Sequence, residues 1–444
     1  MKTNYLFLIL FFPGILFTQT KPGDYKYEDF KTPEYCGASC HTEIYQQWRQ
    51  SLMSMAYTHE WDEIEYFKLA VPHAEKDEKV SEVKAGCNGC HSPIAYVSGD
   101  TPPPLPSKNS RANEGVSCDV CHSIEGYAGD VPYNFNYIMR PGKTKFSGRK
   151  GDVQSPVHEI VVNDLMKKGD FCGICHNEKS PFDVWVKSTH LEWKEGPYYQ
   201  QGVQCQDCHM PKAESKTASM GKTYSDTRLH LFHGAHDPGK VRGTIEIRIN
   251  PDINQIEPGN IVKFTVALYN AKAGHKFPTG SVEDRIVWLE VKAIDAKGNE
   301  YHLPVDKKGF PGEEYTISTE GVLEYQDLGI ALNIPNFKGL ERDAIPSGNR
   351  IFRMPFFDPQ GRMTIQQWNT ASTGVDYRIG PRETKIETFT FKVPENCSPG
   401  KMKVIATLNY QLLVKSVGEF LGVPPSEYEI IKVNEHSTEI EILQ

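Results

Sequence analysis

The chain has 444 residues, of which 39% are hydrophobic and 24% are charged, and its formal net charge is −8 at pH 7. This length is enough for two or three globular domains with ordinary cores. Binding to nucleic acid is not expected, because neutralising phosphates requires clustered Lys and Arg and the acidic chain has no long basic run.

The first 20 residues are predicted to be a secretory signal peptide. Met1 and Lys2 precede an apolar run over residues 5–17, and residues 18–20 are polar. A membrane anchor is the alternative, but Pro13 and Gly14 interrupt the run, which falls short of the roughly 20 apolar residues that a span requires. No later segment is apolar enough to span a membrane. We therefore expect a mature chain without a membrane span, soluble or peripherally held, in the periplasm or outside the cell.

Ten of the eleven cysteines form five close pairs, and a histidine directly follows each pair. The five sets are Cys36, Cys40 and His41; Cys87, Cys90 and His91; Cys118, Cys121 and His122; Cys172, Cys175 and His176; and Cys205, Cys208 and His209. Four have the spacing C-x-x-C-H, and the first has one more residue between its cysteines, a loop that can still bridge two vinyl groups. This pattern is typical of covalent haem attachment, in which two thiols add to the porphyrin vinyls and the next residue brings its imidazole to the iron. We predict five haem c groups, attached by these ten cysteines and ligated by the five motif histidines.

Zinc sites and disulfides are the simpler interpretations of paired cysteines. Two C-x-x-C pairs form a zinc ribbon, but five pairs cannot all find a partner pair, and zinc does not explain a histidine after every pair. Disulfides within such close pairs would close very small loops and constrain the unfolded chain little. The eleventh cysteine, Cys397, stands alone in a turn-like segment and is interpreted as a structural or incidental thiol.

Each haem iron also has a second face, where another side chain can bind. Ten histidines lie outside the motifs, namely His59, His73, His158, His190, His230, His233, His236, His275, His302 and His436. They are enough for all five haems to have two histidine ligands, which favours low-potential electron transfer over open, substrate-binding iron.

The chain resembles the multihaem cytochromes typified by cytochrome c-554. In that family a haem motif is followed by Tyr and then by W-x-x-S-x-H, whose last residue is a distal ligand, and Trp185, Ser188 and His190 match this pattern. Three other stretches are similar to distal positions in such cytochromes: the Ser-Pro-x-His around His158, the cluster from His230 to His236, and the G-H-K-F-P-T-G around His275. The distal ligands expected from the resemblance are His190, His158, His230, His236 and His275.

The first haem departs from this pattern. Tyr45, Trp48 and Ser51 match, but the expected histidine position holds Met53. Met53 is therefore a candidate sixth ligand, which would raise the potential of that haem. His59 in its place, an open iron, and a methionine that only packs on the haem edge are the alternatives.

Residues 25–239 are predicted to form a loop-rich, mainly α multihaem cytochrome domain. Its five haems would supply much of the apolar core, because few long periodic segments occur. Apolar residues at helical spacing predict short helices over residues 42–55 and 182–194. The proline-rich residues 101–106 are predicted to be an extended linker.

Residues 243–444 are predicted to form an antiparallel, Ig-like β-sandwich domain. Alternating apolar residues occur over residues 244–249, 261–269, 286–294, 384–393 and 402–413, and Gly298 and Asn299 indicate a turn. No familiar catalytic motif occurs in this part. His275 lies in a loop between two of these strands, so it either reaches a haem across the domain boundary or is an ordinary loop histidine.

Three functions fit these patterns. The favoured one is periplasmic or extracellular electron transfer along a chain of haems, with other cytochromes or a quinol-oxidising membrane complex as redox partners. The second is an oxidoreductase acting on a small nitrogen or sulfur compound at one open haem, for which the first haem is the candidate. The third is a structural subunit of a surface cytochrome assembly, with the β-sandwich as its interaction surface.

Overall fold

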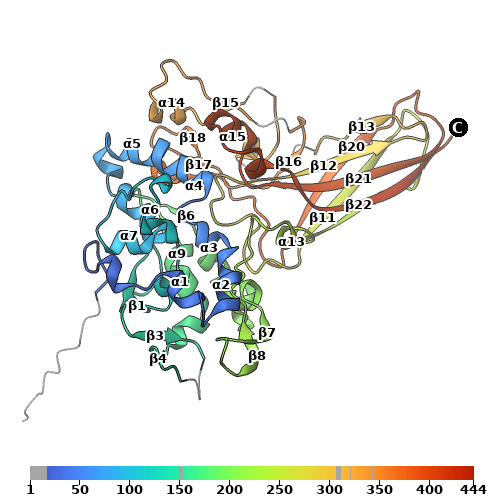
Figure 1. The fold of residues 1–444 in the computed structure, drawn as a ribbon. Helices are drawn as coiled ribbons and strands as arrows, with labels where there is room; N and C mark the ends of the chain where they lie inside the picture. The colour runs from blue at the N-terminus through green and yellow to red at the C-terminus, as the bar shows by residue number, and fades with distance from the viewer. Residues whose placement is uncertain (1–17, 150–153, 307–311, 321, 343–344) are drawn as a thin grey trace, which may run out of the picture.

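The computed structural model describes residues 18–149, 154–306, 312–320, 322–342 and 345–444. The predicted signal peptide falls mainly on residues 1–17 and so lies outside the described residues. Over the described part of the chain, no helix combines the length and the apolar character needed to cross a membrane. Figure 1 shows a helix-rich part that carries the cysteine motifs and an elongated strand-rich part that ends at the C-terminus.

The helix-rich part consists of short helices joined by loops. Its helices are α1 (Pro33–Gly37), α2 (Thr42–Arg49), α3 (Leu52–Met55), α4 (Glu60–Ile64), α5 (Val71–Ala74), α6 (Val83–His91), α7 (Pro93–Val97), α8 (Cys118–Cys121), α9 (Gly169–His176), α10 (Thr189–Lys194), α11 (Pro197–Gln200), α12 (Cys205–His209) and α13 (Pro238–Val241). Small ladders pair β1 (Ile124–Tyr127) with β2 (Tyr137–Met139), β3 (Thr144–Ser147) with β4 (Glu159–Val162), β5 (Glu178–Lys179) with β6 (Trp185–Lys187), and β7 (Lys212–Lys216) with β8 (Thr223–Arg228).

The predictions of two helices in this part are only partly correct. Residues 42–55 form α2 and α3, and the break falls at Ser51, whose backbone is extended. The prediction for residues 182–194 was wrong in its first half, because Trp185–Lys187 pairs with Glu178–Lys179 as a strand and the helix begins only at Thr189. The helical spacing of apolar residues there arises from two elements in succession, not from one.

The strand-rich part contains two larger sheets. One has the order β20 (Thr384–Lys392), β11 (Ile261–Asn270) and β9 (Ile245–Pro251). The other has the order β10 (Gln255–Ile256), β22 (Ile431–Ile442), β21 (Gly400–Gln411), β12 (Ile286–Ile294) and β13 (Glu300–His302), and β16 (Arg350–Ile351) also pairs with β12. The pairs are antiparallel except for β10 with β22, which is parallel, so the expectation of a purely antiparallel arrangement needs this correction.

Alternating side chains create the core between these two sheets. In β11, Val262, Phe264, Val266 and Leu268 are buried, and they share one cluster with Leu289 and Leu408 of the other sheet, among others. The antiparallel register pairs Ile261 with Lys392 and Tyr269 with Thr384, which keeps the apolar positions on one face.

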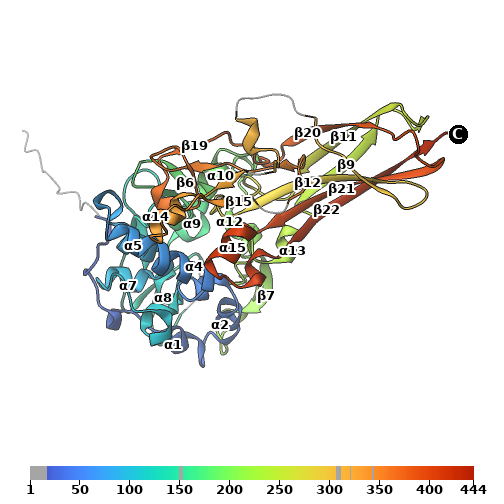
Figure 2. The same cartoon turned by 90° about the horizontal axis from the view of Figure 1, so that it is seen from above.

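A second apolar cluster joins the two parts of the molecule. It contains Trp61 and Leu69 from the helix-rich part together with Trp288 of β12, Leu328 of α14 (Asp327–Ala331) and Val417 of α15 (Lys415–Leu421). Figure 2 shows α14 and α15 lying beside α4 and α5. The two parts therefore share a core and are not connected by the chain alone.

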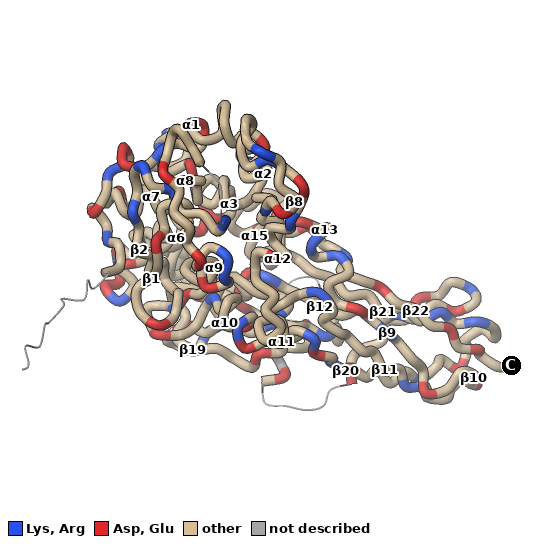
Figure 3. Tube along the Cα trace, turned by 90° about the horizontal axis from the view of Figure 1, so that it is seen from below, with Lys and Arg blue, Asp and Glu red and all other residues tan. Residues whose placement is uncertain are grey.

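Charges of both signs are distributed over the whole molecule. Figure 3 shows Lys and Arg interspersed with Asp and Glu along both parts. This distribution agrees with the absence of a long basic run in the sequence.

Candidate functional site

Short helical turns present the cysteine motifs. In α6, α8, α9 and α12, the two cysteines are three residues apart, which places them on one face of the helix, and the histidine follows at the helix end. The first motif differs, since it has one more residue between its cysteines and does not lie in a single helix. Cys36 lies in α1, and His41 directly precedes α2. None of the eleven cysteines, all of which are described, forms a disulfide.

Cysteines of different motifs lie next to one another. The thiol of Cys36 lies near that of Cys118, and the thiol of Cys172 lies near that of Cys205. The Cys90 thiol contacts the second cysteine of the α9 motif, 4.0 Å from the carbonyl oxygen of Cys175. These contacts join the first motif to the third, and the second motif to the fourth and, through the fourth, to the fifth.

Hydrogen bonds at Nδ1 orient four of the five motif histidines. The Nδ1 atoms of His41, His91, His122 and His209 lie 2.5, 2.8, 2.7 and 2.7 Å from backbone carbonyl oxygens of Thr217, Ala56, Phe146 and His233, respectively. A carbonyl only accepts, so Nδ1 carries the proton in each ring and Nε2 keeps its lone pair. This is the outer hydrogen bond that metal-ligating histidines usually make.

Three motif histidines face a second imidazole across a narrow gap. The ring centroids are 6.2 Å apart for His41 and His158, 6.5 Å for His122 and His230, and 6.4 Å for His209 and His275. The interplanar angles are 32°, 23° and 16° in the same order. Two imidazoles bonded to one metal ion at about 2 Å each have ring centroids roughly 6 Å apart, so these gaps fit one iron between each pair.

The electrostatics of the facing pairs also suit metal ligation. Burial, together with the neighbouring imidazole, lowers the pKa of His209 to about 4 and that of His230 to about 4. Burial likewise lowers the pKa of His122 and of His275. These rings are therefore neutral at physiological pH and have lone pairs available for iron.

The remaining predicted distal residues have different surroundings. His190 is 1% exposed, and its Nδ1 and Nε2 lie 3.0 Å from Asn177 Nδ2 and 3.2 Å from Asp170 Oδ1. His236 lies against His59, with ring centroids 5.1 Å apart at an angle of 85°. Neither forms one of the facing pairs found in the described residues.

The first haem motif has an imidazole opposite it after all. His158 faces His41, whereas Met53 lies in α3, where its carbonyl oxygen accepts a hydrogen bond from Val116 N at 2.9 Å. Sequence reasoning linked Met53 to this haem through a local pattern. The residue opposite His41 instead comes from a distant segment, which local spacing does not encode.

The motif histidine His91 borders a small cavity of about 40 Å³. Its lining includes Glu65, Glu178, Lys187 and Trp368, none of which the sequence analysis singled out. Lys187 Nζ pairs with Glu178 Oε2 at 2.7 Å, so the wall of this cavity is charged. In the described residues no imidazole ring stacks opposite His91.

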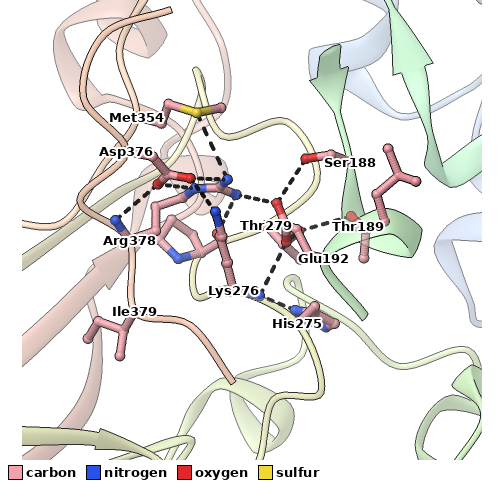
Figure 4. Close-up of polar contacts among 12 residues, drawn as sticks. Ser188, Thr189, Glu192, His275, Lys276, Thr279, Met354, Asp376, Arg378 and Ile379 are labelled. Carbon is pink, nitrogen blue, oxygen red and sulfur yellow. Dashed lines mark hydrogen bonds and ion pairs between the residues drawn. The ribbon is translucent and has the colours of Figure 1, made fainter. Parts of the chain in front are cut away.

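A buried ion pair holds the loop of His275 against the helix-rich part. Arg378 Nη1 donates to Glu192 Oε1 of α10 at 2.7 Å, and both side chains are almost fully buried. Glu192 Oε2 also accepts from Thr279 Oγ1 at 2.6 Å and from Lys276 N at 3.2 Å (Figure 4). Glu192 follows His190 closely in the sequence, but nothing local marked it as the anchor of a distant loop.

Comparison with known families and structures agrees with this arrangement. Residues 36–123 match the family model described as cytochrome c554 and c-prime, and residues 157–241 match the N-terminal region of the NapC/NirT cytochrome c family. No curated protein matches the chain.

A penta-haem cytochrome c552 from Thermochromatium tepidum has a similar fold. The match covers 93% of this chain and 99% of that chain, with a TM-score of 0.60 and 18% sequence identity. Two other structures overlap far less: the CARDB domain of a Pyrococcus furiosus protein (TM-score 0.18, 11% identity, 45% of this chain and 87% of that chain) and Spo0M, a sporulation control protein from Bacillus subtilis (TM-score 0.16, 11% identity, 45% and 49%).

The predicted kinship with multihaem cytochromes is confirmed. Both family models match segments that hold the cysteine motifs, and the fold of a penta-haem cytochrome extends over nearly the whole chain. This protein is a multihaem c-type cytochrome.

Proposed function

We propose that this protein binds five haem c groups and transfers electrons between redox partners by way of them. When bound, each haem supplies an iron that stores and releases one electron. The main support is the set of three facing imidazole pairs, His41 with His158, His122 with His230, and His209 with His275, with gaps that fit one iron each.

The ten motif cysteines attach the haems in this proposal, and the five motif histidines bind the irons. At three of the haems, one imidazole would bind each face of the iron, which would leave no position for a substrate. Two imidazole ligands also give a lower potential than a His and Met pair. A closed, low-potential haem suits electron transfer better than substrate turnover.

The contacts between motifs support a relay through the molecule. Cys36 meets Cys118, Cys90 meets Cys175, and Cys172 meets Cys205, so the attachment edges of neighbouring haems are adjacent. An electron arriving at one haem therefore has near neighbours to reach.

The strand-rich part, residues 243–444, acts in this proposal as an Ig-like sandwich domain that completes the haem site of Cys205 and Cys208. It contributes His275, and the Glu192 to Arg378 ion pair holds that loop in position. The cytochrome domain of residues 25–239 carries the remaining proposed ligands. The shared apolar cluster keeps the two parts in a fixed orientation.

The proposed location is the periplasm or the cell exterior, after removal of residues 1–20. Covalent haem attachment in cytochromes c goes with export, and the match of residues 157–241 to the NapC/NirT cytochrome family supports other cytochromes or a quinol-oxidising membrane complex as redox partners. The acidic net charge of −8 favours a partner with a basic docking face.

Replacing His275 tests the axial pair that spans the two parts. We expect His275→Ala to convert one haem from low-spin to high-spin in the electron paramagnetic resonance spectrum, because His209 loses its facing imidazole. His302→Ala, an exposed histidine of β13, is the matched control and leaves the spectrum unchanged. An unchanged low-spin spectrum in the His275→Ala variant would remove this pair from the proposal.

A second candidate function is ligand or substrate binding at the haem attached to Cys87 and Cys90. The observation that favours it is that, in the described residues, no imidazole ring stacks opposite His91, which borders a small cavity with Glu178 and Lys187 in its lining. Four carboxylates line the same cavity, so Lys187, the one Lys or Arg among its lining residues, is the side chain that can stabilise a small anion there. Among the described residues, neither His91 nor His176 has a facing imidazole ring. Of the two, only His91 lines this cavity, so the candidate open haem is the second one rather than the first.

Cyanide titration of the oxidised protein tests this candidate. One high-spin haem that becomes low-spin on adding cyanide, with several-fold weaker binding in Lys187→Met, would support it. Lys179→Met in the neighbouring strand β5 serves as the control, because Lys179 pairs with the exposed Asp183 instead. Absence of any cyanide-sensitive signal would leave electron transfer as the sole candidate.

A further inference from the structure

A cluster of metal-ligand side chains lies apart from the three facing pairs. His59 precedes α4, His236 lies between β8 and α13, and Glu427 is in a 3-10 turn, Pro425–Tyr428, just before β22. One ligand atom from each of these residues lies within 4.8 Å of the other two. We propose that His59, His236 and Glu427 bind one zinc-class divalent metal ion, separate from the haem irons.

The distances between the ligand atoms of these three residues are close to those around a bound zinc ion. His59 Nε2 lies 3.1 Å and His236 Nε2 lies 3.8 Å from the same atom, Glu427 Oε2. Around a tetrahedral zinc ion with bonds of 2.0–2.2 Å, neighbouring ligand atoms are about 3.3 Å apart. Small side-chain rotations therefore bring all three atoms into coordinating range.

The ring geometry separates this cluster from a haem site. The His59 and His236 rings are 5.1 Å apart and nearly perpendicular, at 85°, whereas the three facing pairs are 6.2–6.5 Å apart with angles of 16–32°. Perpendicular rings approach one point from two directions, as ligands at adjacent corners of a tetrahedron do. A flat porphyrin does not fit between them.

A carboxylate outside the cluster orients one of the ligands. Asp62 Oδ2 lies 2.9 Å from His59 Nδ1, so Nε2, the ring nitrogen that faces Glu427, is the ligand atom. Metal-bound histidines are commonly held by such a carboxylate, and its removal typically weakens metal binding 10–100-fold. The other oxygen, Asp62 Oδ1, lies 3.5 Å from Nδ1 of the haem-motif residue His91. The cluster thus borders the outer side of a proposed haem ligand.

The ligand types indicate the kind of ion. Two imidazoles and one carboxylate suit Zn²⁺ and its first-row neighbours, and three protein ligands leave a fourth position for water or an exogenous group. Calcium and magnesium prefer oxygen ligands and are not expected here. Because the three residues come from distant segments, a bound ion would cross-link the α3–α4 region to the chain just before its last strand.

Zinc titration of the haem-loaded full chain, first treated with a chelator, tests the site. Calorimetry and elemental analysis are expected to give one Zn²⁺ per chain with high affinity, and a higher unfolding temperature when zinc is bound. Affinity should fall at least tenfold in His236→Ala and in Glu427→Gln, and 10–100-fold in Asp62→Asn. His302→Ala is the control histidine and should bind zinc as the natural chain does.

Two results would overturn the proposal. One is the absence of stoichiometric zinc binding, or equal zinc affinity in the natural chain, His236→Ala and Glu427→Gln. The other is a change of one haem from low-spin to high-spin in His236→Ala without zinc, because His236 would then be an axial haem ligand. Unfolding temperatures measured without zinc check that each variant is folded, and Glu427→Gln retains the volume of the natural side chain if His236→Ala fails that check.

Discussion

At the scale of single residues, the role of each histidine depends on its partner across space. Cysteine spacing alone predicted which residues are candidates to attach haem, because two thiols and an imidazole act within one helical turn. The residue opposite each motif histidine comes from elsewhere in the chain: His158 is more than a hundred residues beyond His41. Local patterns favoured His190, which lies between Asn177 and Asp170 instead.

The buried pair of Glu192 and Arg378 yields a residue-scale prediction. Breaking a buried ion pair leaves an uncompensated charge, so Glu192→Gln is expected to lower the free energy of unfolding by about 3 kcal/mol. Chemical denaturation followed by far-ultraviolet circular dichroism measures this loss. The matched control is Glu195→Gln, an exposed glutamate at the end of the same helix, which should change stability by less than about 0.5 kcal/mol.

The same pair predicts a dependence on pH. Burial alone would raise the pKa of Glu192, but Arg378 and the hydrogen bond from Thr279 outweigh it and hold the pKa below its usual value. A carboxyl group with a lowered pKa stabilises the fold above its unfolded pKa, about 4.3, and loses this contribution as the pH falls through its folded pKa. The stability difference between the natural chain and Glu192→Gln should therefore be full at pH 6 and shrink in acid. A difference that grows on acidification would contradict this account.

At the scale of elements, period-two alternation predicted the long strands well. The runs over residues 261–269 and 286–294 correspond to β11 and β12 within one residue at either end. Strand β22 was missed because its middle is polar, with only Val433, Ile440 and Ile442 buried. Its place in the sheet comes from pairing with β21, which a sequence pattern does not reveal.

Helix α14 provides a prediction about the core that joins the two parts. Leu328 is fully buried in the shared apolar cluster, so Leu328→Ala should cost about 2–5 kcal/mol of unfolding free energy. Ile330, 60% exposed on the same helix, is the matched control, and Ile330→Ala should have little effect. Thermal unfolding is followed both at the Soret band and by far-ultraviolet circular dichroism. In Leu328→Ala, the unfolding temperature should fall by the same amount in both signals. A shift confined to one signal would mean that the two parts unfold independently.

At the scale of the whole molecule, the sequence predicted a haem-bearing part and a strand-rich part in the right order. It did not predict that they share an apolar core, because Trp61 and Leu328 are ordinary apolar residues until the chain brings them together. For His275 the sequence left two alternatives: a residue that reaches a haem across the domain boundary, or an ordinary loop residue. The Glu192 to Arg378 pair, which holds that loop, becomes visible only in three dimensions.

The central proposal is that electrons pass along a chain of haems. At three or more of these haems, a histidine binds the iron on each face. Electron paramagnetic resonance of the oxidised natural protein, with spins quantified per chain and haems counted by the pyridine haemochrome assay, tests it most directly. We predict about five haems per chain, with at least three low-spin ferric haems whose signals do not change on adding cyanide. Fewer than three low-spin haems, or cyanide-sensitive signals from most of them, would contradict the proposal.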